Sequence, residues 1–184
     1  DFAKLGAREW FETVIIKRLR AKAVIVGYDF TFGKARSGNV SLLQELCAQH
    51  QIKCEILKPF YLKNTLISSS RIRQLISSGD VAKASQLLGR NYFMDGTIIK
   101  GLKKKKKMGI PTANLDSANE LIPAVGVYAS RLIVGKQQFA AITNVGFNPT
   151  FGNKNLSIES YLFDYSGSLY NKKVRLEFIS RIRE

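Results

Sequence analysis

The segment Gly101-Leu-Lys-Lys-Lys-Lys-Lys-Met-Gly109-Ile-Pro111-Thr112-Ala-Asn114 joins five consecutive cations to a short, stiff turn. Pro111 fixes its own φ and biases the preceding residue toward an extended backbone. Thr112 and Asn114 are two residues apart, so an extended chain points both side chains to one side. Lysines and loop N–H groups bind phosphates, while hydroxyl and amide oxygens are ligands for a hard cation such as Mg²⁺. A lysine run alone is typical of a solvated loop, but the motif that follows it favours a phosphate and metal site.

The sequence from Tyr92 onward has the pattern of an all-β domain. Short alternating or β-branched runs recur there, separated by Gly, Pro and Asn. The runs are Gly96–Lys100, Gly126–Val134, Phe139–Val145, Ser157–Phe163 and Lys173–Ile179. Their length and spacing predict a small antiparallel β-barrel.

The sequence before Tyr92 has an α/β pattern. Ala7–Leu19 has the apolar periodicity of a helix, and a second helix is expected over Val40–Gln49. Ala23–Val26 and Lys53–Leu57 are predicted strands, the first of the fully apolar kind that is buried in a parallel sheet. The loop that follows the first strand lies at its carboxyl end, where α/β sheets bind ligands. The change of pattern near residues 90–92 predicts a domain boundary there.

Three serines stand at the start of a further predicted helix, in Ile67–Arg73. Serine is a preferred N-cap residue, and a helix N-terminus with Arg71 and Arg73 beside it can bind an anion. An ordinary capped helix is the simpler interpretation. Asp80 is placed to cap the next helix, and Gly89 to end it.

The positive charge of the second half of the chain is concentrated in one place, whereas that of the first half is scattered. The 184 residues carry a net charge of +15, which at first suggests a nucleic-acid-binding protein. Residues 1–91 contribute +8 and residues 92–184 contribute +7, and five of the latter charges are the lysines at 103–107. The second half is otherwise almost neutral, which suits a small anion better than a long duplex.

The cysteine content indicates a reducing compartment. Cys47 and Cys54 are too few for a zinc cluster or a disulfide framework. No apolar run approaches the ~20 residues of a membrane span, and no signal-peptide pattern is found. A cytoplasmic location is therefore expected.

One carboxylate in the β half is a candidate for chemistry. In Ser157–Phe163, Glu159 shares a strand face with Tyr161 and Phe163. A surface salt bridge is the usual role of such a residue. The alternative is a general base that removes the proton from an alcohol attacking a γ-phosphate.

An ordered series of motifs runs along nearly the whole chain. The motifs are Gly27-Tyr-Asp29-Phe30-Thr-Phe32-Gly33 with Gly38, Ser68-Ser-Ser70-Arg71-Ile-Arg73, Gly79-Asp-Val81, Leu87-Leu-Gly-Arg90 with Tyr92, Gly109-Ile-Pro-Thr-Ala-Asn114, Gly126-Val-Tyr128, Asn144-Val-Gly146, Pro149-Thr-Phe151, and the Glu159 strand with Leu169-Tyr170. In this order they resemble the prokaryotic bifunctional riboflavin kinase/FMN adenylyltransferase family, also called FAD synthetase. The resemblance implies an α/β plus all-β protein. A partial Rossmann-like FMN adenylyltransferase domain would occupy residues 1–91, and a riboflavin kinase β-barrel domain residues 92–184.

The resemblance also implies roles for single residues. In the kinase, Thr112 and Asn114 would bind the ATP phosphates and Mg²⁺, with Gly109 and Lys106 bordering the nucleotide. Glu159 would activate the ribityl 5′-hydroxyl of riboflavin. The nucleotide- and flavin-binding residues of the adenylyltransferase would be Gly27, Asp29, Phe30, Phe32, Ser70, Arg71 and Arg73. The implied ligands are ATP, Mg²⁺, riboflavin and FMN, with no nucleic acid and no membrane.

The chain departs from the family pattern at both ends. The family's adenylyltransferase carries two histidines in a loop after its first strand, whereas this sequence has one, His50, in another context. That strand, its loop and the C-terminal helix of the kinase are expected to be absent, so FMN adenylylation by these 184 residues is not expected. In the kinase loop, Lys105 replaces a glycine, and a Cβ there can hinder the approach of backbone to phosphate. Asn171 replaces another glycine and tolerates positive φ.

An enzyme of FMN and FAD biosynthesis is the leading hypothesis, and two other interpretations stay open. A small β-barrel with a basic loop could be a non-catalytic nucleic-acid-binding protein, although no aromatic residues are interleaved with these lysines. The third interpretation is a degenerate flavin-binding remnant that Lys105 and the absent ends have inactivated.

Overall fold

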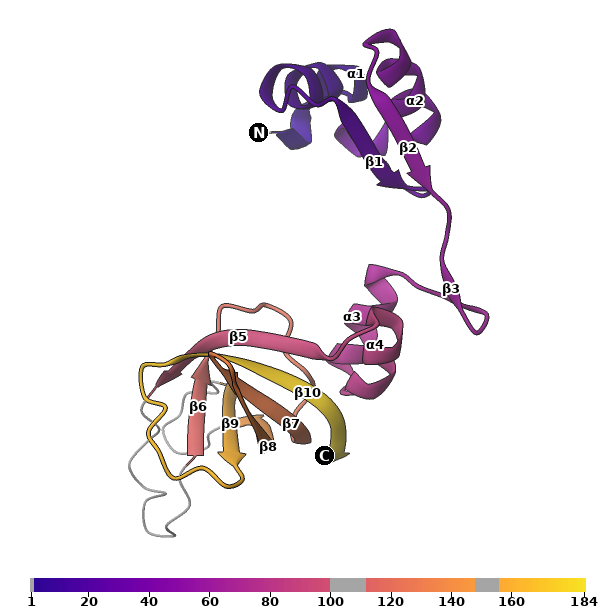
Figure 1. The fold of residues 1–184 in the computed structure, drawn as a ribbon. Coiled ribbons are helices and arrows are strands. Elements are labelled where there is room, and N and C mark those ends of the chain that lie inside the picture. Colours follow the sequence, from indigo (N-terminus) through magenta and orange to yellow (C-terminus); the bar gives the residue numbers. More distant parts are fainter. Residues whose placement is uncertain (1, 100–111, 148–155) are drawn as a thin grey trace. The chain divides into compact units, whose positions relative to one another are not determined.

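The structure is a computed structural model that describes residues 2–99, 112–147 and 156–184 (Figure 1). The chain forms two compact units, Asp1–Leu66 and Ile67–Glu184. The first unit contains a 3₁₀ turn (Phe2–Lys4), α1 (Ala7–Trp10), a π-helix (Phe11–Arg18), β1 (Ala23–Gly27), a 3₁₀ turn (Lys34–Arg36), α2 (Val40–Gln49), β2 (Lys53–Leu57), β3 (Tyr61–Leu62) and β4 (Thr65–Leu66). The second contains α3 (Ser69–Ser77), α4 (Val81–Leu88), β5 (Tyr92–Ile99), β6 (Thr112–Asp116), β7 (Gly126–Val134), β8 (Gln137–Phe147), β9 (Leu156–Leu162) and β10 (Lys173–Arg183).

The first unit is a small α/β layer. β1 and β2 pair in parallel, as a connection through α2 allows. Phe11 of the N-terminal helix and Leu43 of α2 are fully buried in one apolar core. Trp10 packs against the ring of Phe32, with ring centroids 5.2 Å apart. The helices and strands predicted for this half of the sequence are confirmed.

The burial predicted for the first strand is wrong. Ala23–Val26 is apolar throughout, but Ile25 is 61% exposed, whereas Val24 and Val26 pack against the core. Leu57 of β2 is likewise 50% exposed. Successive side chains of a strand point to opposite faces, and here only one face of the two-stranded sheet packs on the helices.

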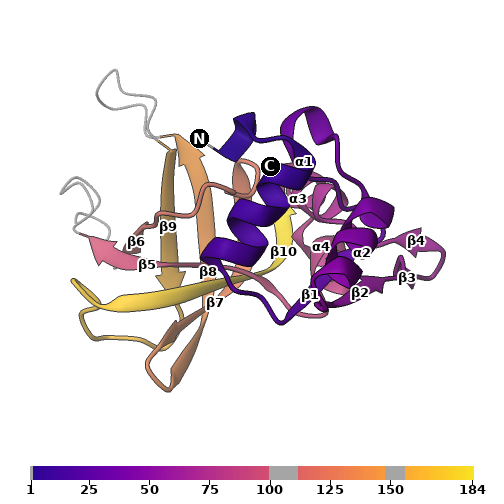
Figure 2. The ribbon, with the colours of Figure 1, turned by 90° about the horizontal axis from the view of Figure 1, so that it is seen from above.

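The second unit is built on a closed barrel with the strand order β10-β5-β6-β9-β8-β7. All neighbouring strands are antiparallel, and β8 and β9 can be followed side by side in Figure 2. The predicted antiparallel barrel is therefore confirmed. Thr112–Asp116 forms an additional strand, which the stiff turn motif marked only as extended backbone.

The interior of the barrel is mostly apolar and contains a group of buried hydroxyls. Met94, Leu132 and Phe178 are fully buried there. Among them runs a chain of three hydroxyls: Ser130 Oγ lies 2.7 Å from Thr143 Oγ1, which lies 2.8 Å from Ser160 Oγ. These bonds join β7, β8 and β9 on their inner faces, and they satisfy hydroxyls whose burial would otherwise be costly.

The helical hairpin α3–α4 packs with the barrel, since α4 contacts β5 and β10. Ser68 Oγ accepts from the backbone N–H of Arg71 (3.2 Å), and Asp80 Oδ1 accepts from that of Lys83 (3.2 Å). Gly89 ends α4 with φ +69°, so the predicted caps are confirmed. The compact units divide after Leu66, and the assignment of residues 67–91 to an adenylyltransferase domain stays a prediction.

Candidate functional site

The pairing of β6 with β9 brings the candidate base beside the candidate metal ligands. The register places Asn114 opposite Glu159 and Thr112 opposite Tyr161. Directly opposed residues on one sheet face have Cβ atoms about 5 Å apart. Ala113, between the two β6 residues, is buried in the barrel core, so Thr112 and Asn114 lie on the outer face.

Glu159 is also a member of a longer row. The β8–β9 register places Asn144 opposite Glu159 on the side away from Asn114. We call Asn114, Glu159 and Asn144 the amide–carboxylate row. Asn144 belongs to the motif Asn144-Val-Gly146, which by itself indicates no role for the residue. Alternation along β8 puts Asn144 on the outer face, but only the cross-strand register shows that it lies beside Glu159.

The burial of Glu159 is unusual for a carboxylate on the outside of a barrel. Its residue exposure is 8%, although its neighbours Ile158 and Ser160 are the ones that face the core. Removing a charged group from water is costly, so a carboxylate kept in such a place is a better candidate for a specific task than a solvated surface residue. Glu159 is therefore shielded from bulk water and lies beside Asn114.

An apolar patch borders the row on one side. Tyr161 follows Glu159 on the same face of β9 and lies opposite Ile142 on β8. The Tyr161 ring packs edge-on against Phe163, with centroids 5.4 Å apart and an interplanar angle of 81°. The polar row is therefore bounded on this side by aromatic and aliphatic surface.

Several predicted site residues lie outside the described part of the chain. These are Lys106 and Gly109 of the kinase motif, with Lys105 and the rest of the lysine run at 103–107. Their roles as nucleotide-binding residues stay predictions. Of the residues predicted for the kinase site, the described ones are Thr112, Asn114 and Glu159, and these lie together.

The loop predicted to line the adenylylation site lies in the first unit. The backbone N–H of Phe30 donates to the Gly27 carbonyl oxygen (3.1 Å), and Asp29 at the tip is exposed. Phe32 is 5% exposed, and its ring stacks on that of Phe30 with centroids 5.7 Å apart. A Cβ at Gly38 would come within 2.6 Å of the Phe32 ring. Phe32 is thus a core residue of the unit, while Asp29 is available to a ligand.

Ser70, Arg71 and Arg73 lie on α3 in the second unit, and all three are exposed. The Arg71 guanidinium donates to Gln74 Oε1 (3.0 Å) within the same helix. The predicted adenylyltransferase residues therefore come from two compact units, and neither unit contains the complete set. Their joint role stays a prediction.

His50 follows the last residue of α2 and is a surface residue. Its Nε2 lies 2.9 Å from Glu12 Oε1, and its ring packs against Phe11 with centroids 5.6 Å apart. These contacts fix the helix end, and they do not resemble a histidine pair around a phosphate.

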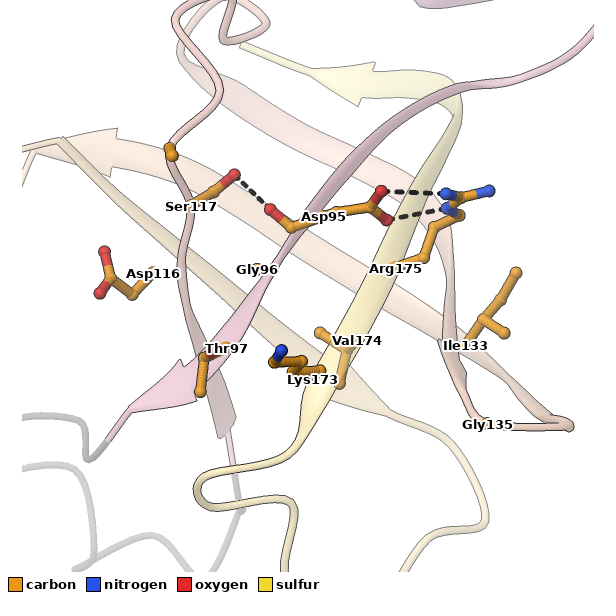
Figure 3. Close-up of a pocket in the computed structure, with 11 residues that line it drawn as sticks. Asp95, Gly96, Thr97, Asp116, Ser117, Ile133, Gly135, Lys173, Val174 and Arg175 are labelled. Atoms are coloured by element: carbon orange, nitrogen blue, oxygen red, sulfur yellow. Dashed lines mark hydrogen bonds and ion pairs between the residues drawn. The ribbon is translucent and has the colours of Figure 1, made fainter.

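A cavity of about 850 Å³ lies elsewhere on the barrel, over β5, β6 and β10 (Figure 3). Its lining residues are Asp95, Gly96, Thr97, Asp116, Ser117, Ala118, Ile133, Gly135, Lys173, Val174 and Arg175. Gly96 permits the close approach of two strands here, because a Cβ would lie 2.2 Å from the Asp116 carbonyl oxygen.

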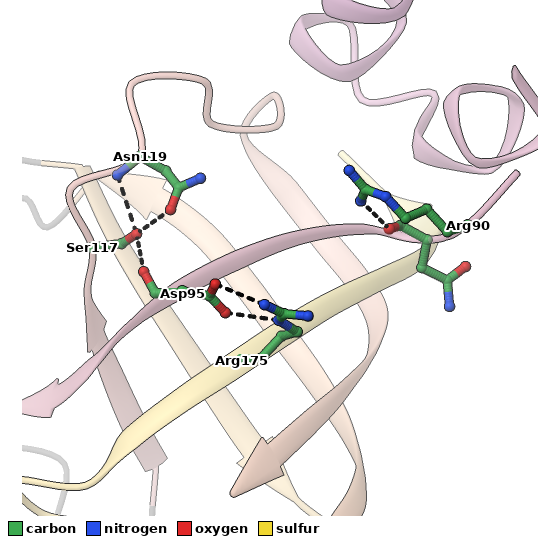
Figure 4. Close-up of polar contacts among 6 residues, drawn as sticks. Arg90, Asp95, Ser117, Asn119 and Arg175 are labelled. Atoms are coloured by element: carbon green, nitrogen blue, oxygen red, sulfur yellow. Dashed lines mark hydrogen bonds and ion pairs between the residues drawn. The ribbon is translucent and has the colours of Figure 1, made fainter. Parts of the chain in front are cut away.

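Two charged groups of this cavity, Asp95 and Arg175, are paired with each other (Figure 4). Arg175 donates from Nε and Nη2 to the two carboxylate oxygens of Asp95, at 2.8 and 2.9 Å, and this contact holds the pKa of Asp95 below its usual value. The guanidinium also lies 3.6 Å from the centroid of the Phe93 ring. Ser117 Oγ donates to the Asp95 carbonyl oxygen (2.6 Å) and accepts from the N–H of Asn119 (3.2 Å). The cavity thus offers no unpaired base at Asp95.

The described residues contain no cluster of three or more His, Cys, Asp or Glu that could hold a metal ion. The oxygen atoms of Thr112 and Asn114 fit a different kind of Mg²⁺ site, in which phosphate and water oxygens supply most of the ligands and the protein supplies one or two. Within the described ranges, no helix is long and apolar enough to span a membrane.

Comparison with known proteins assigns both parts of the chain. Residues 88–184 match the family model described as riboflavin kinase, and residues 1–71 match the one described as FAD synthetase. The chain belongs to the riboflavin kinase family. The riboflavin kinase match includes all six barrel strands, and therefore the whole amide–carboxylate row.

Similar curated proteins carry both activities in their names. A bifunctional riboflavin kinase/FMN adenylyltransferase from Buchnera aphidicola subsp. Acyrthosiphon pisum is 35% identical over the full chain, and one from Bacillus subtilis is 33% identical over 99% of it. The chain spans about 60% of the length of these curated relatives. A solved structure described as a macrolide-efflux protein from Streptococcus pneumoniae has a TM-score of 0.83 and 33% identity, covering 100% of this chain and 59% of that one. Family membership and fold therefore agree with the resemblance in the motifs.

Proposed function

We propose that the chain transfers the γ-phosphoryl group of ATP to the ribityl 5′-hydroxyl of riboflavin, giving FMN and ADP. The observation that carries this proposal is the register that sets Glu159 opposite Asn114, with Thr112 two residues away on the same strand face. Phosphoryl transfer depends on positioning and charge neutralisation more than on covalent participation by the protein. A base beside two oxygen donors meets these needs.

Glu159 is the general base of the proposed reaction. The hydroxyl oxygen attacks the γ-phosphorus of ATP while the Glu159 carboxylate accepts the hydroxyl proton. The bond between the γ-phosphorus and the β–γ bridging oxygen breaks, and ADP leaves. The proton then remains on Glu159 until it passes to solvent. A positioned base of this kind contributes about 10²- to 10⁴-fold to a rate.

Thr112 and Asn114 are the proposed ligands on the phosphate side. Their hydroxyl and carboxamide oxygens point to one side of β6, where they can hold Mg²⁺ or a phosphate-bound water. When bound, Mg²⁺ supplies neutralisation of the negative charge on the phosphates. Lys106 and Gly109 are proposed to lie beside the nucleotide phosphates, and this assignment is based only on the sequence motif.

Adenylylation of FMN is named for the longer relatives, and we expect none from this chain. The sequence holds one histidine, and its contacts with Glu12 and Phe11 fix it at a helix end. We assign the kinase reaction to the cytoplasm, because both cysteines are free thiols and reducing compartments keep thiols reduced.

The test is direct. The protein is incubated with riboflavin, ATP and Mg²⁺, and the products are separated by chromatography; FMN and ADP are expected in equal amounts. Riboflavin bound without any FMN formed would support the degenerate remnant instead. Binding of single-stranded nucleic acid with no affinity for riboflavin would favour the non-catalytic barrel. Incubation with FMN and ATP should give no FAD.

A further inference from the structure

Asn144 is the member of the amide–carboxylate row to which no role is assigned. It lies opposite Glu159 on β8, while Asn114 lies opposite Glu159 on β6. Asn144 is exposed, whereas Glu159 is 8% exposed. With Cβ atoms of opposed residues about 5 Å apart, the Asn144 carboxamide can reach a group that is bound at the Glu159 carboxylate.

The surroundings of Asn144 leave room for its side chain. Gly146 is the next residue on the same face of β8, and a Cβ there would lie 3.2 Å from Asn144 Nδ2. The carboxamide thus lies in space that the glycine leaves. Ser157, opposite Gly146, donates its hydroxyl to the Gly146 carbonyl oxygen (3.1 Å), so that hydroxyl is already engaged.

The other neighbours on this side are apolar. Ile142 precedes Asn144 on the same face of β8 and is 38% exposed, and Tyr161 lies opposite Ile142. On β8, the polar side chain within reach of a ligand at Glu159 is therefore the carboxamide of Asn144. Asn114 and Asn144 approach the base from opposite sides, so they meet different parts of a substrate that reacts at Glu159.

We propose that Asn144 binds the hydroxyl groups of the acceptor, a polyhydroxylated chain attached to a flavin ring, and so orients the reacting hydroxyl toward Glu159. This inference rests on the proposed kinase function, in which Asn114 serves the phosphate side. A carboxamide both donates and accepts hydrogen bonds, so it can engage two neighbouring hydroxyls at once. Asn144 is then a determinant of specificity for the ribityl chain.

The first experiment compares Asn144→Ala with Gln138→Ala in the full chain. Gln138 is an exposed carboxamide on the same strand and the same face, six residues away, or about 20 Å. Loss of one or two hydrogen bonds should raise the KM for riboflavin about tenfold in Asn144→Ala and leave the KM for ATP unchanged. Gln138→Ala should match the wild type in both. Thermal melting of all three proteins verifies folding.

The second experiment measures binding without turnover. Quenching of flavin fluorescence gives the Kd of riboflavin and of lumiflavin, which has the same ring with a methyl group in place of the ribityl chain. Asn144→Ala should weaken riboflavin binding about tenfold and leave lumiflavin binding unchanged. Gly146→Ala, which crowds the carboxamide, should show a smaller loss of the same selectivity.

An equal loss for the two flavins would overturn the proposal, because it would indicate a general disturbance of the site. An unchanged Kd for riboflavin would overturn it as well. If the wild type binds riboflavin but forms no FMN, the proposed kinase function fails, and the comparison of Kd values still decides the role of Asn144. Absence of riboflavin binding by the wild type would overturn both.

Discussion

Two carboxylates on the outside of the barrel differ in their burial and in the residues opposite them on the neighbouring strands. Glu159 is 8% exposed and has neutral carboxamides opposite it on both neighbouring strands. The Asp95 side chain is 55% exposed, lines the 850 Å³ cavity and is bound by both nitrogens of an arginine fork. A base must be able to accept a proton, and an ion pair that lowers the pKa of Asp95 works against this. The proposed reaction therefore rests on the strand register at Glu159 and not on the cavity at Asp95.

Substitution of the two carboxylates by their amides gives the largest expected contrast. Glu159→Gln keeps the size of the side chain but removes the proposed base, so FMN formation should fall about 100-fold or more. Asp95→Asn should retain nearly full activity. Initial rates measured by chromatography at saturating riboflavin and ATP check this. Equal activity of Glu159→Gln and the wild type would remove Glu159 from the mechanism.

A methyl group added at Gly96 should lower the stability of the barrel. The added Cβ would lie 2.2 Å from the Asp116 carbonyl oxygen and 2.8 Å from Leu115 Cδ1, so β5 and β6 must move apart. We expect Gly96→Ala to lower the free energy of unfolding by about 2 kcal/mol, the usual cost of overpacking. Urea titration followed by circular dichroism measures it. Gly135→Ala is the control for the added methyl, because a Cβ there meets nothing within 4 Å, although its φ of +58° adds some strain.

Loss of the phosphate-side amide should have an intermediate effect. Asn114→Ala removes one of the two proposed oxygen ligands, and we expect the KM for ATP and the Mg²⁺ concentration for half-maximal rate to rise about tenfold. The KM for riboflavin should change little. If Asn114→Ala instead raised only the KM for riboflavin, the phosphate-binding role proposed for Asn114 would be contradicted.

The acid stability of the barrel should show the smallest effect. The folded-state pKa of Asp95 is lowered by its hydrogen bonds to Arg175, so its contribution to stability is present above the unfolded-state pKa. It is lost as pH falls through the folded-state pKa. Both side chains are exposed, so solvent screens the pair and the effect is small. The Tm of Asp95→Asn should be slightly below that of the wild type at pH 7, and the two should converge below about pH 3. A constant difference across this range would contradict the assignment.

Local features of the fold were predictable from the sequence. Alternation marked five of the barrel strands, and the caps at Ser68, Asp80 and Gly89 followed from the preferences of single residues. Thr112–Asp116 was not marked as a strand, since a short Thr-Ala-Asn-Leu-Asp run carries little β signal and gains its partners only in the barrel. The open face of β1 could not be foreseen either, because an apolar run does not reveal how many layers cover it.

The candidate site was predictable in its members more than in its arrangement. Thr112, Asn114 and Glu159 were found through motifs, and the structure brings them together. The position of Asn144 beside Glu159 depends on a register between strands, which is set by packing over the whole barrel. The low exposure of Glu159 is a second property of this kind, because alternation alone gives an outer-face position without its degree of burial.

Trp10 is the only tryptophan of the sequence, and it packs on Phe32 in the first unit. Tryptophan fluorescence, excited selectively, therefore reports the unfolding of the first unit alone. Five of the seven tyrosines, Tyr92 and Tyr128 among them, lie in the second unit, so near-ultraviolet dichroism reports mainly on that unit once the indole contribution is subtracted. The wild-type chain thus contains its own pair of optical probes, which can establish whether its two halves denature in one step or in two.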